Sequence, residues 1–126
     1  ELATEPLILL DLPLSREYFF ALFMKDGLEP RIYSRCIHQE VVRTMVANGY
    51  GYTLANVRPR SDRSLDGRRI VSIPLAGQHR PMVIGTMTLA RARKSRLMTT
   101  FEDHCRASIS NTAIPGMFAP DEISSP

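Results

Sequence analysis

Three polar side chains follow three separate apolar segments of the chain, and each could hydrogen-bond a small molecule. Ser15 follows the run PLILLD, His38 follows the run centred on Ile32, and Asn56 closes the run that begins at Tyr50. A hydroxyl, an imidazole and an amide can each donate and accept hydrogen bonds. The three residues can therefore form one binding site, provided that the fold brings their segments together.

The elements between these residues predict an α/β fold. The continuous apolar run at 6–11 is typical of a strand buried on both faces, and further strands are expected at 30–35 and 50–57. One helix is expected from Ser15, as its N-cap, to a stop at Gly27, and another from near His38 to a stop at Gly49. Strands that alternate with helices through short connections indicate parallel strands with right-handed crossovers.

A parallel sheet of this kind predicts where a ligand would bind. Ligands bind beyond the carboxyl ends of the strands, where the N-termini of the helices also lie. Three connections, at 12–16, 36–38 and 56–60, are expected at that edge. Free backbone N–H groups there favour an anion, and the guanidinium of Arg58 suits a carboxylate. The alternative is structural: Ser15 only caps a helix, Asn56 only closes a turn, and Arg58 is a solvated charge.

The second half of the chain gives weaker signals. A polar surface loop is expected at 58–69, followed by strands at 70–75 and 81–89. Thr99 and Glu102 have the spacing of a capping box, which predicts the start of a last helix with one apolar face. The segment 111–126 contains three prolines and no periodicity, so we expect a mobile tail.

Catalysis and metal binding are poorly supported by the residue pattern. A thiolate at Cys36 beside His38 would suggest nucleophilic chemistry, but no recognisable nucleophile motif surrounds this pair. A zinc site from Cys36, His38, His104 and Cys105 would require two remote segments to meet. We therefore expect no enzymatic activity, no metal and no cofactor, and reduced cysteines.

Composition excludes other classes. The chain has 126 residues, 44% of them hydrophobic, and lacks the run of about 20 apolar residues that spans a bilayer. A net charge of +3 permits contact with anions, but the arginine clusters contain no aromatic residues for stacking bases. The chain begins with an acidic segment, without Met or a basic signal region. This start predicts either a cytoplasmic protein or a piece of a longer one.

Several segments together resemble the C-terminal part of LysR-type transcriptional regulators. They are PLILLDLPLSREYF, GLEPRI, EVVRTMVANGYGYTLANVRPRSD and RPMVIG, and the block from EVVR to GYTL is the most specific. The resemblance covers nearly all of residues 5–110. It implies an effector domain of the periplasmic-binding-protein type 2 kind, with three layers, a mostly parallel sheet, a returning strand and a C-terminal helix.

The same resemblance implies a domain organisation and partners. Residues 5–75 would form the second subdomain, 76–110 would return to a first subdomain whose first half is absent, and 111–126 would be the tail. A small, possibly anionic effector would bind between the subdomains of a homodimer or tetramer. Promoter DNA would be bound by an N-terminal helix-turn-helix domain absent from this chain. The family's cleft contacts correspond here to Pro13, Ser15, Arg16, Cys36, Ile37, His38, Asn56, Val57 and Arg58.

One departure and two alternatives remain. Relatives tend to carry small hydroxyl residues where this chain has Cys36, Ile37 and His38, which leaves the effector's identity open. A solute-binding protein of the same fold would normally be secreted, and an enzyme would need a base and a nucleophile in contact. We also expect the isolated chain to self-associate through strand 82–89 or the tail, because that strand lacks sheet neighbours.

Overall fold

The computed structural model describes residues 2–80, 82–83, 85–91, 93–110, 113–114 and 117. The chain forms two units: the first comprises Glu1–Asn56 and Ser61–His79, and the second comprises Val57–Arg60 and Arg80–Pro126. The predicted division at 75 and 76 stays a prediction. The elements, in chain order, are a 3-10 helix η1 (Leu2–Thr4), β1 (Leu7–Leu10), α1 (Pro13–Met24), β2 (Ile32–Cys36), α2 (Gln39–Ala47) and α3 (Arg96–Ser108).

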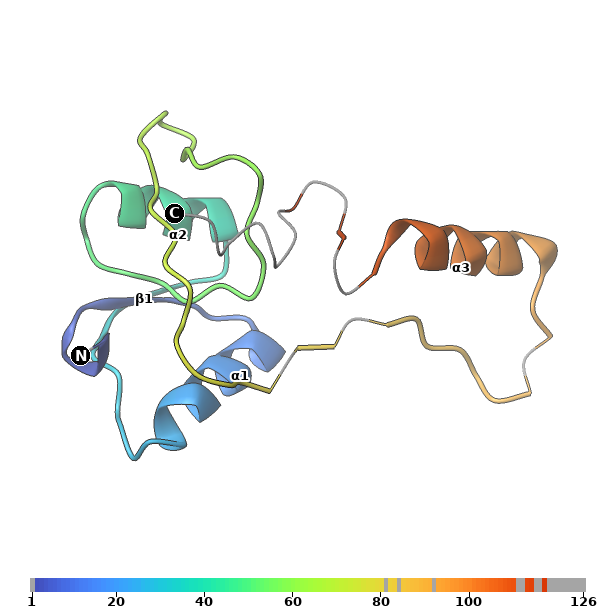
Figure 1. Cartoon of the computed structure of the whole chain (residues 1–126), viewed down its shortest axis with the longest axis horizontal. Coiled ribbons are helices and arrows are strands. Elements are labelled where there is room, and N and C mark those ends of the chain that lie inside the picture. Colours follow the sequence, from blue (N-terminus) through green and yellow to red (C-terminus); the bar gives the residue numbers. More distant parts are fainter. Residues whose placement is uncertain are drawn as a thin grey trace. The chain divides into compact units, whose positions relative to one another are not determined.

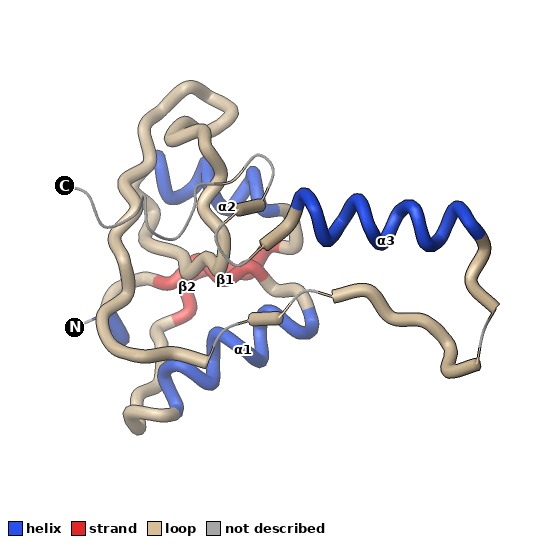
Figure 2. Tube along the Cα trace, turned by 45° about the vertical axis from the view of Figure 1, so that its right-hand side comes forward, coloured by secondary structure: helices blue, strands red, loops and turns tan. Residues whose placement is uncertain are grey.

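The first unit is built around β1, which pairs with β2 in parallel. On its other side β1 meets Tyr52, where the backbone N–H of Ile8 donates to the Tyr52 carbonyl at 2.8 Å. Helices α1 and α2 lie on opposite sides of the sheet (Figures 1 and 2). The predicted α/β fold with a parallel sheet is therefore confirmed.

The core lies between β1 and the two helices. Leu7 and Leu9 form a buried cluster with Phe19 and Phe23, which are one turn apart on α1. Ile8 points to the opposite face of β1, the side of α2, and is 0% exposed. Burying each such side chain stabilises the fold by about 1.5–3 kcal/mol. The apolar run at 6–11 thus has the two-sided burial that the sequence predicted.

The predicted third strand at 50–57 is wrong in extent, because only Tyr52 forms a bridge, to Leu7. Gly51 has φ +150°, which brings its backbone against Pro6. The hydroxyl of Tyr52 donates to the carbonyl of Leu2 at 2.8 Å, and burial, followed by the charge of Glu5, raises its pKa. Tyr52 therefore attaches this segment to the start of the chain as well as to β1.

The later strands are also not formed. Residues 70–75 contain no strand, and neither do 82–83 and 85–89; positions 81 and 84 lie outside the described residues. Their apolar side chains are exposed, for example Ile73 at 85% and Met87 at 97%. A strand needs a neighbouring strand to satisfy its backbone groups, and none pairs with these runs in the part of the chain that the structure describes.

The apolar side chains at the start of α2 differ in burial. Val42 is 2% exposed, whereas Val41 is 46% exposed. Gly49 follows the end of α2 with φ +80°, as expected for a helix stop, and Gly27 follows α1 with φ +65°. No helix within the described residues is long and apolar enough to cross a membrane.

In the second unit, α3 begins one turn earlier than the capping-box pattern predicted. The side chain of Ser95, not Thr99, accepts a hydrogen bond from the backbone N–H of Met98 at 3.2 Å. Glu102 is buried and receives Lys94 Nζ at 2.7 Å, which lowers the pKa of its carboxyl group. The expected apolar face of α3 is exposed, with Leu97 at 79% and Phe101 at 59%. The tail at 111–126, predicted to be mobile, lies largely outside the described residues.

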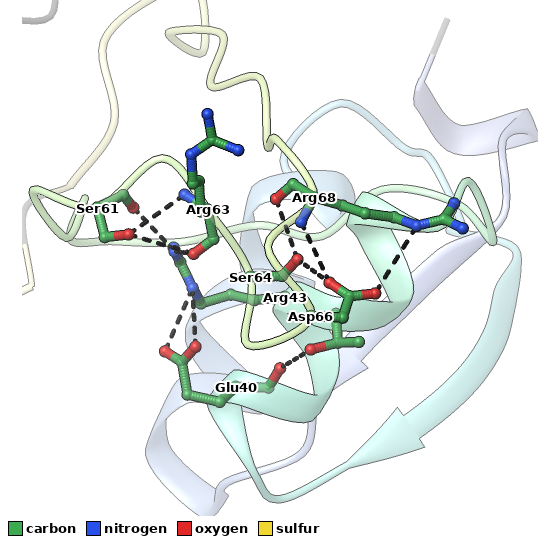
Figure 3. Close-up of polar contacts among 8 residues, drawn as sticks. Glu40, Arg43, Ser61, Arg63, Ser64, Asp66 and Arg68 are labelled. Atoms are coloured by element: carbon green, nitrogen blue, oxygen red, sulfur yellow. Dashed lines mark hydrogen bonds and ion pairs between the residues drawn. The ribbon is translucent and has the colours of Figure 1, made fainter.

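Residues 61–69 belong to the stretch 58–69 that was expected to be a polar surface loop. With Ile70 they form a compact turn that we call the 61–70 hairpin. Its two ends are joined by a hydrogen bond from Ile70 N to Asp62 O at 2.7 Å. Ser64, which is 5% exposed, donates to Asp66 and to the Arg68 carbonyl inside the turn (Figure 3). Asp66 also accepts a hydrogen bond from Asn48 Nδ2 at 2.7 Å, which connects the hairpin to the end of α2.

Gly51 provides a test of the close approach between its backbone and Pro6. A Cβ atom on Gly51 would lie 3.0 Å from the carbonyl carbon of Pro6 and closer still to its oxygen. Gly51→Ala should therefore lower the free energy of unfolding by more than about 3 kcal/mol.

Gly49→Ala is the matched control, because its Cβ would meet nothing within 4 Å. It should cost only the about 1 kcal/mol of a left-handed residue. Urea unfolding measures both, and equal losses would contradict the predicted clash.

Asp66 gives the hairpin a pH dependence. Hydrogen bonds from Ser64, then from Asn48, lower the pKa of Asp66 below its ordinary value. A lowered pKa stabilises the folded state above the unfolded-state value of about 4, and this contribution is lost as pH falls through the lower folded-state pKa. Stability should therefore fall below about pH 4. Asp66→Asn should make that fall shallower than in the unsubstituted chain, as measured by urea unfolding curves at pH 2–6. An unaltered slope in Asp66→Asn would contradict the assignment.

Candidate ligand-binding site

The carboxyl ends of β1 and β2 lie side by side, as the sequence predicted for parallel strands. The backbone N–H of Asp11 donates to the carbonyl of Cys36 at 2.9 Å. This contact brings the connection at 11–16 next to the connection at 36–38. Each connection leads into a helix, so α1 and α2 begin at the same edge of the sheet.

A charged cluster that the sequence analysis overlooked lies at this edge. Asp11 accepts a hydrogen bond from Arg16 Nη1 at 3.0 Å and pairs with Arg35 Nη1 at 3.4 Å. The carboxylate is mostly covered, at 19% exposure, whereas the arginine side chains are 40% and 49% exposed. Two cations around one anion leave a net positive charge. Two features of the sequence could have indicated this cluster: Asp11, the charge that ends PLILLD, and Arg35, which precedes the last residue of the second strand.

Ser15 does not cap α1, contrary to the prediction. The helix begins two residues earlier, at Pro13, and its N-cap is Leu12, which makes no side-chain cap hydrogen bond. Proline favours the first helical position because its ring fixes φ and its nitrogen has no hydrogen to leave unpaired. Ser15 therefore lies in the first turn, and Arg16 in the same turn points its guanidinium at Asp11.

Helix α2 begins after His38, as predicted, but its side chain makes no cap hydrogen bond either. The backbone N–H of His38 instead donates to Cys36 Sγ at 3.4 Å, and the thiol approaches the His38 carbonyl at 3.7 Å. Both contacts of the thiol involve the backbone of His38, which is the geometry of a turn rather than of a base and a nucleophile. Ile37, which lies between Cys36 and His38 in the sequence, is 60% exposed. Both cysteines of the chain are free.

The third predicted connection divides between the two units. Asn56 is exposed and is the last residue of the first part of unit one, whereas Val57 and Arg58 belong to unit two. Tyr52 runs parallel to β1 opposite Leu7, and Asn56 lies four residues beyond Tyr52 just as Asp11 lies four beyond Leu7. Only Tyr52 of this segment pairs with β1, however, so the place of Asn56 at the same edge stays a prediction. The contribution of Val57 and Arg58 to the site stays a prediction.

Both helices at this edge lack a side-chain cap, whereas α3, in the other unit, has one from Ser95. The first N–H groups of a helix have no partner within the helix, so an uncapped N-terminus favours an anion. Within the described residues, no group of three or more His, Cys, Asp and Glu side chains could hold a metal ion. The arrangement is therefore suited to hydrogen bonding with an anion.

Residues 1–110 match the family described as the LysR substrate binding domain. The chain belongs to this family. A solved LysR family transcriptional regulator from Pseudomonas aeruginosa, HinK, is 37% identical over 84% of this chain, with a TM-score of 0.73. The C-terminal domain of a probable LysR family transcriptional regulator from Rhodococcus sp. RHA1 is 29% identical over 83% of this chain, with a TM-score of 0.71. Among curated proteins, none matches significantly.

This LysR substrate-binding domain chain spans only part of the proteins that it resembles. It covers 37% of the HinK chain and 52% of the Rhodococcus chain. The match confirms the family inferred from the segments PLILLDLPLSREYF and EVVRTMVANGYGYTL.

The two serines near helix starts provide a matched test of the capping assignment. Ser95→Ala should lower the free energy of unfolding by about 1 kcal/mol, because it removes the N-cap of α3. Ser15→Ala should change it by less than about 0.5 kcal/mol, because Ser15 lies within the first turn of α1 and caps nothing. Thermal and urea unfolding would measure both variants. A larger loss in the free energy of unfolding for Ser15→Ala than for Ser95→Ala would contradict this assignment and favour Ser15 as the N-cap of α1.

Proposed function

We propose that this LysR substrate-binding domain binds a small anionic effector at a site that we call the rim. The rim comprises residues 11–16, 35–38 and 56–58. Its binding residues are those predicted from the sequence, Pro13, Ser15, Arg16, Cys36, Ile37, His38, Asn56, Val57 and Arg58, together with Asp11 and Arg35.

The observation that carries the proposal is the arrangement of Arg16 and Arg35 around Asp11. Each guanidinium contacts Asp11 through Nη1, and a guanidinium has five N–H donors, so donors remain for a ligand carboxylate. Asp11 holds both arginines in place, which lowers the entropy cost of binding. The uncapped starts of α1 and α2 add backbone donors and partial positive charge at the same edge.

The same features favour binding without turnover. A carboxylate ligand would be held by arginines and backbone N–H groups, which orient and neutralise but do not transfer protons at neutral pH. The Cys36 thiol is engaged with the backbone of His38. We therefore propose a sensor and not an enzyme, in which the ligand biases an equilibrium between two conformations.

In the whole protein, we propose that effector binding controls transcription. Promoter DNA would be bound by a helix-turn-helix domain outside this sequence, in a cytoplasmic homodimer or tetramer. The relatives are LysR family regulators, which supports the regulatory role. The exposed apolar residues of α3, Leu97 and Phe101, support self-association, because large apolar patches mark interaction surfaces.

Screening the full-length protein by differential scanning fluorimetry tests the proposal. Small carboxylates, amino acids and aromatic acids are the compounds to test, and titration calorimetry then gives the affinity of each compound that raises Tm. Arg16→Gln and Arg35→Gln should each weaken binding at least tenfold, since a hydrogen bond to a charged group contributes about 1.5–3 kcal/mol. Arg58→Ala should also weaken it. The control is Arg106→Gln, on α3, which should leave the affinity unchanged.

Two results would contradict this assignment. One is an effector whose affinity is insensitive to all three rim arginines. The other is a set of hits that contains only amino acids with cationic side chains. A ligand that is chemically converted during the titration would contradict the sensor and favour an enzyme.

A further inference from the structure

We propose that Arg43 is a positioning residue that couples the rim to the point where the chain passes between its two units. This inference deepens the proposed function, on which it rests, by naming a residue that would transmit effector binding. The segment Val57–Arg60, which we call the link, belongs to the second unit, and the chain returns to the first unit at Ser61. Arg43 lies on α2 and binds the chain directly after the link.

The contacts of Arg43 are directional and well covered. Its Nη2 donates to the carbonyls of Ser61 and Arg63, both at 2.8 Å, and its Nε pairs with Glu40 at 3.2 Å (Figure 3). The Arg43 side chain is only 12% exposed, although it is charged. A guanidinium held by three acceptors has a more definite orientation than one that makes a single hydrogen bond.

Helix α2 joins Arg43 to the rim. The helix follows His38, a rim residue, and Arg43 lies five residues further, about 7.5 Å along the axis. The backbone hydrogen bonds of a helix make it move as one body, so a displacement at its start reaches Arg43. Glu40 lies in the first turn of α2, and its carboxylate pairs with the guanidinium of Arg43. The orientation of Arg43 therefore depends on the end of the helix that lies at the rim.

The 61–70 hairpin is rigid enough to pass that displacement on. Ser64 N donates to Arg68 O at 2.9 Å, and Arg63 Nη1 donates to Gly67 O at 2.8 Å, so the hairpin is internally bonded. A second connection, from Asn48 to Asp66, attaches it to the other end of α2. Of the two connections, the one through Arg43 is closer in sequence to the link, because it holds the first residue after it.

Chemical modification of Cys36 tests the coupling without an effector. Cys36 Sγ accepts the N–H of His38 at the start of α2, so alkylation by iodoacetamide disturbs this helix end. In the full-length protein, hydrogen exchange of a peptide covering 57–63 is measured before and after alkylation. We expect a change of at least threefold with Arg43 present and less than 1.3-fold in Arg43→Met. Cys36→Ser, treated identically, controls for reaction at other sites.

Three further variants distinguish coupling through Arg43 from general effects on the fold. Arg43→Lys keeps the charge but not the forked geometry and should retain only part of the coupling. Asn48→Ala cuts the other connection and should retain the coupling, and Arg106→Met should not affect it. Unchanged exchange at 7–12 shows that β1 is intact in each variant.

The proposal is overturned by equal alkylation effects with and without Arg43, or by no effect with Arg43 present. It is also overturned if Asn48→Ala abolishes the coupling as completely as Arg43→Met, because general loosening of the hairpin would then explain both. Failure here leaves the effector site unaffected, since that site is tested by the affinities of the rim arginine variants.

Discussion

The first unit depends on one short strand whose two edges and two faces are all occupied. Residues of β1 hydrogen-bond to β2 on one edge and to Tyr52 on the other, while α1 and α2 lie on opposite sides of the sheet. Leu7, Ile8 and Leu9 are each at most 1% exposed as a result. Parallel strands have their carboxyl ends at the same edge of a sheet. The residues that directly follow β1 and β2 therefore lie at one edge. The rim residues 11–16 and 35–38 lie at one edge for this reason.

The parts that the sequence predicted well are those determined by burial and by backbone conformation at single residues. Leu7, Ile8 and Leu9 in PLILLD are buried on both faces of a strand, as predicted, and Gly27 and Gly49 adopt the positive φ that stops a helix. The strands expected at 70–75 and 82–89 failed for a different reason. A strand is completed by its neighbour, and local sequence cannot show whether a neighbour is present. Ser15 failed because Pro13 competes for the helix start and has the stronger conformational preference.

The adjacency of two of the connections at the proposed site was predictable, but the contacts there were not. The edge followed from the order of strands and helices, so the connections at 12–16 and 36–38 were found. Asp11 and Arg35 were overlooked because their partnership joins residues 24 apart, and sequence spacing does not show such contacts. The 61–70 hairpin was missed similarly. Its charges suggested a solvated loop, yet Arg63 donates to a carbonyl within the turn, and the carbonyls of Ser61 and Arg63 are bound by Arg43.

The difference between the helix starts explains how stability and binding can be separated in this chain. An N-cap side chain contributes about 1 kcal/mol, and α3 has one. Neither α1 nor α2 has one, although both begin where the parallel strands end. At α2 a sulfur atom accepts the His38 N–H at 3.4 Å, and a thiol is a weak acceptor. Backbone donors at this edge are thus left weakly satisfied beside two arginines. In the function that we propose, an anion at this edge would form hydrogen bonds with these donors, and that interaction would favour one conformation of the domain over another.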